Sequence, residues 1–379
     1  MKVAHVNYLP TYLPGIQNRI INQARASFDQ ELNVDFFILN SDLESSKKNI
    51  KYKKINFSKF FIIKYIQQKL YRYKIIESLV PFQNYDYVVL RYPLAMGIGV
   101  KSFYNKWGQK IITEHHTIEE YEIKYYFNSK LLSTLCSFIE KKYKKYILKK
   151  TIGMIGVTNE IVSRNLRPLN EKKMITNGVD ISILKKTNRP KFEDTLNMIF
   201  VASRFAVWHG LDKLILAANK YNGPINIRIR IAGNLLDENL KKSLKLFNNK
   251  WIEFEYLGSK KREELEELYS DTHLAISSLG LDRIGLEEGC VIKTREYIAK
   301  SIPFIYSYRD CDLSGKEVFA YKVSKDANKI DFSRIIQFYL NLQGVNYENA
   351  MNDFAINKIN LKIKVKEMWD FINKIDNCQ

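Results

Sequence analysis

Short apolar runs alternate along the chain with longer stretches in which apolar residues recur at a helical period. In the first half, the short runs lie at residues 3–8, 34–39, 87–90, 110–113 and 153–157. Runs of this length that are rich in β-branched and aromatic residues are typical of strands. Between the first two runs, apolar side chains recur every four residues, at Ile16, Ile20, Ala24 and Phe28. This period predicts one apolar face of a helix, so the chain opens as strand, helix, strand.

The same alternation resumes after the polar, proline-bearing stretch 185–191. Strand-like runs follow at residues 198–202, 227–232, 254–257, 273–277 and 303–306. Strands that alternate with helices indicate parallel sheets with helices on their faces. We therefore predict an α/β protein of two doubly wound units in tandem. Because ligands bind beyond the carboxyl ends of strands in such sheets, two facing units also predict a cleft.

Composition and cysteine usage fit a folded protein of a reducing compartment. The 379 residues suffice for two or three domains of about 150 residues each, and the hydrophobic content of 46% is ordinary for a globular protein. The N-terminal residues lack a signal-peptide stretch, and no window approaches the roughly 18 apolar residues of a membrane span. The cysteines are far apart and form no Cys-x-x-Cys, at Cys136, Cys290, Cys311 and Cys378. We expect free thiols and a cytoplasmic location.

Two acidic residues bracket the predicted start of a helix in the second half. Glu288 and Glu296 lie eight residues apart and follow the strand-like run 274–279. A helix that opens near Val291 presents unpaired N–H groups and the positive end of its dipole to an anion. The arrangement suits a ligand with a diphosphate in its middle and hydroxyl groups at both ends. Two exposed acids on a loop would have the same spacing.

A series of short motifs places this pair in a wider pattern. In order, the second half contains Asn177-Gly-Val-Asp180, Val201-Ala-Ser-Arg204, His209-Gly210, Ile231-Ala-Gly233, Tyr256-Leu-Gly258, Ser277-Ser278 and Glu288 to Glu296 followed by Tyr297 to Pro303. The first half contains Pro14-Gly15-Ile16 and Thr113-Glu-His-His-Thr117. In this order the motifs resemble those of retaining GT-B glycosyltransferases of family four, of the bacterial polysaccharide or lipid-linked oligosaccharide type. The resemblance spans almost the whole chain.

The resemblance implies the GT-B architecture of two Rossmann-like domains that face each other across a cleft. Residues 1–180 would bind the acceptor and residues 181–360 the nucleotide-sugar donor. The last segment, 361–379, would form a helix that crosses back onto the first domain. Trp369 and Phe371 would then pack at the hinge.

For the donor site, the resemblance implies a role for each motif residue near the predicted helix start. Glu296 would hydrogen-bond the ribose hydroxyls, and Glu288 would contact the donor sugar near its reacting face. Backbone N–H groups around Val291 and Ile292 would cradle the distal phosphate. Lys293 is a weaker candidate for a phosphate partner.

Two more residues of the second half would neutralise the diphosphate. Arg204 corresponds to the family's diphosphate-binding arginine, a role that suits its permanent charge and forked donors. His209 stands where the family usually has a lysine, which is the clearest departure from the pattern. A neutral imidazole still donates one hydrogen bond, and a bound dianion favours its protonated form, so we expect charge neutralisation at His209 to depend on pH. A histidine that only caps a helix is the alternative.

In the first half, we choose His116 as the histidine near the anomeric centre, with His115 as the alternative. Alternation along a strand points neighbouring side chains to opposite faces, so one of the two is expected to be structural. Glu114 and Glu119 are further acids near the site, although charged residues at strand ends are usually only solvated.

Two other residues complete the prediction for the first half. Gly15 would let the backbone approach the phosphate or sugar without a Cβ in the way, unless it only forms an ordinary turn. Arg91 is a candidate for the acceptor side.

The reaction that the resemblance implies is transfer of a sugar from a nucleoside diphosphate with retention of anomeric configuration. Stabilisation of the leaving diphosphate and placement of the acceptor hydroxyl would carry the catalysis, so catalytic roles fall to His116 and Glu288. The family generally needs no cofactor and no divalent metal. We interpret the Asp-x-Asp sequence at Asp310-Cys-Asp312 as a coincidental loop motif.

The formal net charge of +19 is concentrated in two windows of the predicted acceptor-binding unit. Residues 46–76 contain ten Lys or Arg and no acid, and residues 124–151 contain eight Lys and one Glu. Aromatic and aliphatic residues are interleaved with the lysines, as in helices that lie on an anionic bilayer. We therefore expect a peripheral protein of the inner face of the plasma membrane with a lipid-linked acceptor, such as a precursor of capsule, O-antigen or exopolysaccharide.

Other classes of protein remain as alternatives. Basic segments with interleaved aromatics also occur in nucleic-acid-binding proteins, but no recognised binding module is present, so we predict no nucleic-acid partner. A non-catalytic sugar-nucleotide-binding protein of the same fold would share the donor motifs. A GT-B epimerase or phosphorylase is a minor alternative.

Overall fold

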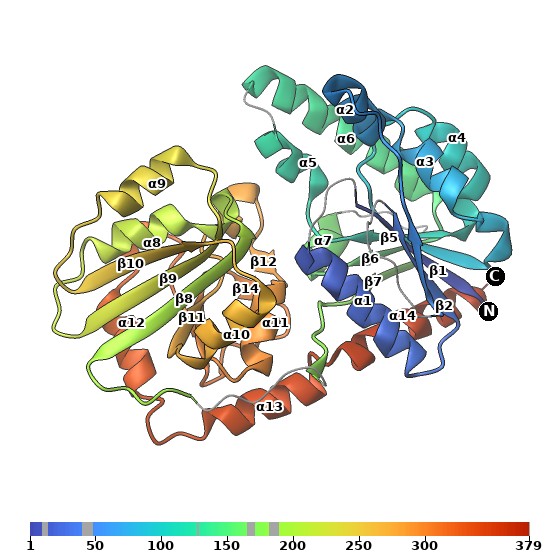
Figure 1. Ribbon diagram of the computed structural model, residues 1–379. Helices are drawn as coiled ribbons and strands as arrows, with labels where there is room; N and C mark the ends of the chain where they lie inside the picture. The colour runs from blue at the N-terminus through green and yellow to red at the C-terminus, as the bar shows by residue number, and fades with distance from the viewer. Residues whose placement is uncertain (10–13, 40–47, 127–128, 165–170, 182–188, 379) are drawn as a thin grey trace. The chain divides into compact units, whose positions relative to one another are not determined.

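The computed structural model describes residues 1–9, 14–39, 48–126, 129–164, 171–181 and 189–378. The chain forms two compact units (Figure 1). Unit 1 comprises Met1–Thr176 and Leu361–Gln379, and unit 2 comprises Asn177–Asn360. The division thus lies four residues before the predicted one at residue 180. Residues 185–188 of the predicted linker 185–191 and parts of the two basic windows fall outside the described residues.

Unit 1 is built on a seven-stranded parallel sheet with the order β3-β2-β1-β4-β5-β6-β7. Its strands are β1 (Val3–Tyr8), β2 (Val34–Leu39), β3 (Ile50–Lys53), β4 (Tyr87–Arg91), β5 (Ile111–His115), β6 (Gly153–Gly156) and β7 (Glu171–Met174). The interior strand β1 pairs in parallel with β2 and β4, with Val3 opposite Val34 and Tyr87. Every residue of β1 is buried, as expected for a strand covered on both faces.

Helices cover both faces of this sheet. They are α1 (Pro14–Phe28), α2 (Phe61–Leu70), α3 (Arg72–Leu79), α4 (Val100–Trp107), α5 (Glu119–Glu122), α6 (Lys130–Lys150), α7 (Asn159–Arg164) and α14 (Leu361–Asp376), with 3-10 turns η1 (Phe82–Asn84), η2 (Gly108–Lys110) and η3 (Ile123–Tyr126). One core cluster joins the sheet to α3, α4 and α6, and a second joins its other face to α1 and α14. This two-sided packing is the doubly wound arrangement.

The helices at the two ends of the chain meet on the second of these faces. Ile20 and Ala24 of α1 are buried as predicted, whereas Phe28 is 55% exposed because the helix ends there. The terminal helix α14 lies in unit 1. Its Phe371 is buried in the core beside α1, and Trp369 packs against the same cluster. The predicted hinge position for these two aromatics is therefore wrong.

Unit 2 contains a six-stranded parallel sheet with the order β10-β9-β8-β11-β13-β15. Its strands are β8 (Thr195–Arg204), β9 (Asn226–Asn234), β10 (Ile252–Gly258), β11 (Leu274–Ile276), β13 (Phe304–Tyr306) and β15 (Ala320–Lys322). Two further short strands, β12 (Glu288–Gly289) and β14 (Arg309–Asp310), pair with each other. Glu288 thus lies in a strand and not in the loop that we predicted.

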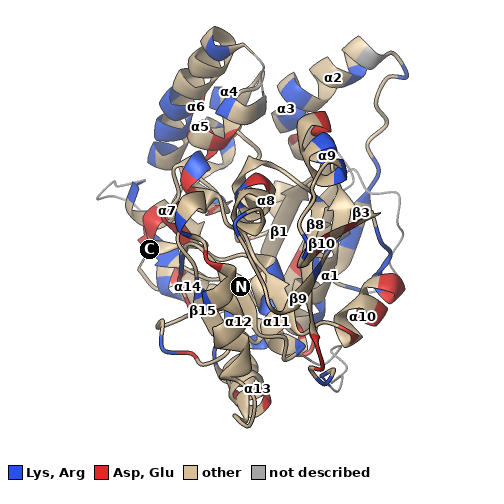
Figure 2. Cartoon of the chain, turned by 90° about the vertical axis from the view of Figure 1, so that its left-hand side faces the viewer, with Lys and Arg blue, Asp and Glu red and all other residues tan. Residues whose placement is uncertain are grey.

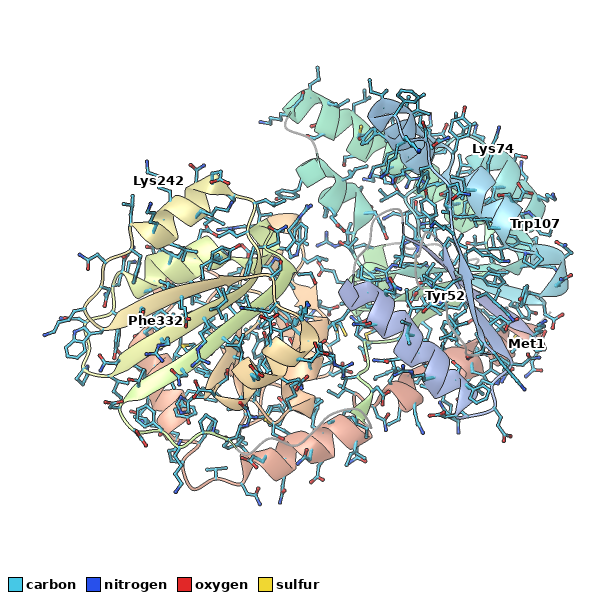
Figure 3. The ribbon with its side chains drawn as sticks, viewed as in Figure 1. Met1, Tyr52, Lys74, Trp107, Lys242 and Phe332 are labelled. Atoms are coloured by element: carbon cyan, nitrogen blue, oxygen red, sulfur yellow. The ribbon has the colours of Figure 1, made fainter. Side chains whose placement is uncertain are left out.

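Most helices of unit 2 bury apolar side chains. They are α8 (Leu211–Ala218), α9 (Glu238–Lys245), α10 (Arg262–Ser270), α11 (Ile292–Ala299), α12 (Phe332–Leu340) and α13 (Tyr347–Asn357), with η5 (Val207–His209), η6 (Leu281–Ile284) and η7 (Ala327–Lys329). Phe332 of α12 lies in the interior of the unit (Figure 3). Within the described ranges, no helix combines the length and apolar character needed to cross a membrane. The four cysteines are free, as predicted.

Candidate functional site

In unit 2, Arg204 and the start of α11 belong to the same edge of the sheet. Arg204 is the last residue of β8, and its side chain is exposed. The neighbouring parallel strand β11 ends at Ile276, and α11 is the helix that follows it before β13. The carboxyl ends of neighbouring parallel strands share an edge, so the first turn of α11 begins on the side where β8 ends.

The segment after β8 is bound directly to the segment after β11. The N–H of Leu279 donates to the carbonyl of His209 at 2.9 Å, and that of Gly280 donates to the carbonyl of Trp208 at 3.1 Å. Gly210 has a φ of +72°, and a Cβ there would lie 2.9 Å from the Leu279 carbonyl carbon. A residue with a side chain would separate the two segments, which explains the glycine after His209.

The first turn of α11 is fixed to the end of β11 by side chains. Thr294 Oγ1 lies 2.9 Å from Ser277 Oγ and 2.7 Å from the hydroxyl of Tyr308. The N-cap residue, Val291, provides no side-chain cap. The first N–H groups of a helix have no partner within the helix, so the backbone near Val291 and Ile292 is suited to an anion. The predicted helix start is confirmed.

The two acidic residues of the donor motif each contact a cation. Arg309 Nη2 donates to Glu288 Oε1 at 2.6 Å, and Glu288 is almost fully buried. Lys293 Nζ donates to Glu296 Oε2 at 2.7 Å. Burial opposes the charge of Lys293, but the Glu296 carboxylate outweighs it and raises the pKa of this lysine. Lys293 is therefore a charged partner of Glu296.

His209 is held by the turn that contains it. Its Nδ1 lies 3.0 Å from the backbone nitrogen of Ala206 and 3.3 Å from the Ala206 carbonyl oxygen. Burial lowers the pKa of His209 to about 4. In the protein without ligand, the ring is therefore a neutral hydrogen-bond donor near neutral pH. The predicted dependence of its charge on pH would require a bound anion to raise this pKa substantially.

The Asp-x-Asp sequence forms a buried ion cluster with Arg295. The guanidinium of Arg295 donates to both carboxylate oxygens of Asp310, at 2.8 Å for Oδ1, and it also contacts Asp312. Its Nε donates to the carbonyl of Asn177 at 3.3 Å. Burial opposes this charge, but Asp310 outweighs it and raises the pKa of Arg295 well above its usual value. The motif is thus a structural anchor between α11 and β14.

A second polar cluster occupies the carboxyl ends of β4 and β5 in unit 1. Arg19 of α1 donates from Nη2 to Glu114 Oε1 at 3.1 Å, and its Nη1 lies 3.1 Å from His116 Nδ1. His116 Nε2 lies 3.3 Å from Glu114 Oε1, and His5 Nε2 lies 3.3 Å from Glu114 Oε2. Glu114 is buried in this cluster and is not the solvated strand-end acid that we expected.

Burial and two nearby cations keep the ring of His116 neutral. Burial lowers the pKa of His116 to about 3, and Arg91 and Arg19 add to this effect against the opposing influence of Glu114. Burial, assisted by Arg19, lowers the pKa of Arg91 to about 10, so its guanidinium remains charged at neutral pH. The cluster therefore presents a neutral imidazole beside two guanidinium groups.

His115 has different surroundings from His116. Its ring is fully buried, stacks on Tyr92 and places Nδ1 2.7 Å from Glu119 Oε1. Lys144 of α6 donates to Glu119 Oε2 at 3.0 Å. Burial opposes ionisation of Glu119, but His115 and Lys144 outweigh it and lower its pKa to about 2. Like Glu114, Glu119 is not a solvated acid, and these contacts give His115 a structural role.

Solved structures resemble the chain along nearly its whole length. No protein-family model and no curated protein matches the sequence. A glycosyltransferase from Rickettsia africae is 17% identical, with a TM-score of 0.64, and the match covers 99% of this chain and 98% of that one. Anabaena Alr3699/HepE in complex with UDP and glucose is 12% identical, with a TM-score of 0.65, and the match covers 98% and 99% of the two chains. WaaG, a glycosyltransferase involved in lipopolysaccharide biosynthesis, is 12% identical, with a TM-score of 0.64 and the same coverage.

The chain has the GT-B fold. The predicted fold class is thus confirmed, because the chain forms two units, each with a parallel sheet covered by helices. At these identities the likeness establishes the GT-B fold alone, and the retaining mechanism and membership of family four stay predictions.

Sequence reasoning missed two arginines of this GT-B chain. Arg19 follows Gly15 by one helical turn, and both lie in α1, where Gly15 occupies the first turn and not a separate turn. That spacing was the one available signal for Arg19. Arg295 sits beside Glu296 in the motif, but its burial depends on Asp310, which lies 15 residues further along the chain.

Proposed function

We propose that this protein is a glycosyltransferase that transfers a sugar from a nucleoside-diphosphate sugar to a glycan acceptor with retention of configuration. The observation that carries the proposal is the shared edge of Arg204 and the first turn of α11, which Ser277 fixes through Thr294. A guanidinium and the start of a helix are both suited to a diphosphate. HepE, which has the same fold, was solved with UDP and glucose and supports the choice of donor.

Within this reaction, the residues of unit 2 stabilise the leaving diphosphate. The Arg204 guanidinium and the first N–H groups of α11 bind the phosphate oxygens, where negative charge develops as the glycosidic bond breaks. His209 donates one hydrogen bond as a neutral ring. Glu296 accepts hydrogen bonds from the ribose hydroxyls, and Glu288, held by Arg309, accepts from the donor sugar.

In unit 1, His116 binds a sugar hydroxyl or the acceptor as a neutral ring, because burial, Arg91 and Arg19 oppose its protonation. For retention, the acceptor hydroxyl must attack the same face of the sugar from which the diphosphate leaves, so the contribution of His116 is orientation of the reacting groups. His115 positions this segment through Glu119.

The proposed reaction needs no divalent metal. Support comes from the Asp-x-Asp carboxylates, which are engaged by Arg295. In the described part of the chain, no cluster of His, Cys, Asp and Glu has the arrangement of a metal site. Transfer in excess EDTA tests this point, and full loss of activity that manganese restores would contradict it.

The acceptor is proposed to be lipid-linked, in the synthesis of a surface polysaccharide, with the protein bound peripherally to an anionic membrane. Lys and Arg recur along α2, α3 and α6 at one end of unit 1 (Figure 2). Large apolar side chains are exposed among them, including Leu131 at 83%. The similarity to WaaG supports a surface-polysaccharide role. We expect co-sedimentation with phosphatidylglycerol vesicles at low salt and none with phosphatidylcholine vesicles. Binding to DNA fragments in place of vesicles would favour the nucleic-acid alternative.

A direct test is a screen of nucleotide sugars for turnover. UDP-, GDP-, dTDP-, ADP- and CMP-sugars would be incubated with the protein, and release of the nucleotide would be measured with and without lipid-linked glycans. We expect slow hydrolysis of one donor and faster release when the acceptor is present. Binding of a nucleotide sugar without any release would favour the non-catalytic alternative.

A further inference from the structure

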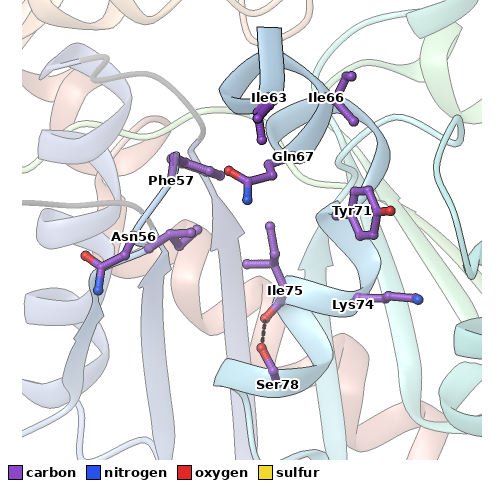
Figure 4. A pocket seen from close by; sticks show the side chains of 10 residues that line it. Asn56, Phe57, Ile63, Ile66, Gln67, Tyr71, Lys74, Ile75 and Ser78 are labelled. Atoms are coloured by element: carbon purple, nitrogen blue, oxygen red, sulfur yellow. Dashed lines mark hydrogen bonds between the residues drawn. The ribbon is translucent and has the colours of Figure 1, made fainter. Parts of the chain in front are cut away.

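Unit 1 contains a pocket of about 550 Å³ between the β3–α2 connection and the helices α2 and α3 (Figure 4). Most of its walls are apolar: Ile55 and Phe57 come from the connection, Ile63 and Ile66 from α2, and Ile75 from α3. Its volume lies within the range of about 300–1,000 Å³ that is typical of ligand pockets. The pocket lies in the first basic window, apart from the candidate sites described above.

Hydrogen bonds hold one wall of the pocket in place. The backbone N–H of Ser58 donates to Gln67 Oε1 at 2.8 Å, which joins the connection to α2. Ile63 and Ile66 nevertheless remain 47% and 39% exposed. Exposed apolar side chains that line a concave surface indicate a binding site for an apolar group. The pocket is therefore formed and accessible without an occupant.

A cation in the lining of the pocket favours an anionic occupant. Lys74 lines the pocket, and its Nζ lies 5.6 Å from the centre of the Tyr71 ring. The surrounding sequence from 46 to 76 has ten basic residues and no acid, and Glu77 follows it in α3. A purely apolar partner would make no use of the Lys74 charge. A hydrocarbon chain that carries a phosphate would match both the apolar walls and the cationic edge.

The same helices are connected to the candidate site of unit 1. The N–H of Ile98 donates to the carbonyl of Leu70 at 2.6 Å, and the Tyr73 hydroxyl donates to the carbonyl of Leu94 at 2.7 Å. The segment that contains Leu94 follows β4, which ends at Arg91. The helices that form the pocket are thus hydrogen-bonded to the segment that follows Arg91.

We infer that this pocket binds the hydrocarbon chain of a phosphate-bearing lipid, which for this protein is the lipid portion of its acceptor. The identification with the acceptor rests on the proposed function. The binding itself does not, because a soluble amphiphile suffices to measure it. The membrane surface would deliver such a lipid to α2, and the pocket would hold one chain of it.

Isothermal titration calorimetry with decyl phosphate, below its micelle concentration, tests this inference. We expect saturable binding at one site, no binding of inorganic phosphate, and weaker binding of decyl maltoside. Ile66→Asp should weaken decyl phosphate binding about tenfold or more, because it places a charge against the chain. Ile356→Asp is the matched control, because it makes the same change at an exposed residue of α13 in unit 2 and should leave binding unchanged. Lys74→Gln should reduce the preference for decyl phosphate over decyl maltoside.

The inference is overturned if the wild-type protein shows no saturable binding, or if Ile356→Asp weakens binding as much as Ile66→Asp. Ile63→Ser provides a milder change if Ile66→Asp fails to fold, and it should also weaken binding. Titration of nucleoside diphosphates into the same samples separates the two proposals. Binding of decyl phosphate without any nucleotide would support the pocket and contradict the proposed donor site. Binding of a nucleotide without decyl phosphate would support the donor site and contradict the pocket.

Discussion

The buried ion pair between Lys144 and Glu119 offers a sharp test of how α6 positions the histidine segment. Lys144→Met keeps a long unbranched side chain and removes the ammonium group. Lys144 is 3% and Glu119 4% exposed, so water cannot replace the lost partner without opening the structure. Glu119 would then retain His115 as its one close partner. We expect the variant to be strongly destabilised in unit 1.

The expected cost follows from the burial of the pair. Loss of one partner from a buried ion pair typically costs about 3–5 kcal/mol. The fall in the pKa of Glu119 from 4.5 to about 2 corresponds to about 3 kcal/mol at 1.36 kcal/mol per pKa unit, and His115 and Lys144 contribute to it together. Because the folded-state pKa is lowered, this stability is present above about pH 4.5 and is lost as the pH falls towards 2. The variant should therefore lose about 3 kcal/mol at pH 7.5 and less at pH 4, where Glu119 can take up a proton.

Native-state hydrogen exchange followed by mass spectrometry measures this loss, since peptides of unit 2 serve as an internal reference. Lys145→Met removes a neighbouring exposed lysine and should change the opening free energy by less than about 0.5 kcal/mol. Lys144→Met with Glu119→Gln removes both charges of this pair, so that of the two acids only Glu120 loses its cation, and it should be less destabilised than Lys144→Met alone. A loss below about 1 kcal/mol, or a double variant worse than the single one, would refute the reasoning.

Three further predictions follow from other parts of the structure. The pKa values of about 3 for His116 and about 4 for His209 lie below the usual 6.5 of an unfolded histidine. The folding stability that these two histidines contribute should therefore be complete above pH 6.5 and should fall between pH 6.5 and pH 5. A urea midpoint that stays constant over this range would contradict this. Asp310→Asn should lower the free energy of unfolding by about 3 kcal/mol, measured by thermal or urea denaturation, because the buried charge of Arg295 loses one of its two ion pairs. A loss as small as that of a surface substitution would contradict this prediction. Gly233→Ala should cost at least about 2 kcal/mol, because the backbone has a φ of +145° and a Cβ would lie 1.7 Å from the Ala202 carbonyl oxygen; a variant as stable as the wild type would be inconsistent with this geometry.

The strands of the two cores were predictable because burial leaves a local mark. Strands covered on both faces consist of apolar runs, and every run that we predicted as a strand contains one. The strands that were missed lack this mark. β3 and β7 form the edges of the first sheet and contain the polar sequences Ile-Lys-Tyr-Lys and Glu-Lys-Lys-Met. Charged edge strands are common, and local pattern alone does not separate them from loops.

In the candidate sites, too, some features were predictable from the sequence and others were not. The start of α11 was predictable, because the helical pattern and the acidic pair lie within a few residues of each other. The partners that fix each charge were not predictable, because they come from distant parts of the chain. Arg19 meets Glu114 across 95 residues, and Lys144 meets Glu119 across 25. Such contacts depend on which strands are neighbours, which a single sequence does not specify.

The central claim is that the carboxyl edge of unit 2 binds the diphosphate of a nucleotide sugar. Isothermal titration calorimetry of UDP and GDP with the wild type, Arg204→Ala and Arg228→Ala tests it most directly. Arg228 of β9 is the matched control, because it precedes Asn234, the carboxyl end of its strand, by six residues. The account predicts that one nucleotide binds, that Arg204→Ala weakens binding by about 1.5–3 kcal/mol, and that Arg228→Ala has little effect. Equal affinities for all three proteins, or binding of neither nucleotide, would contradict it.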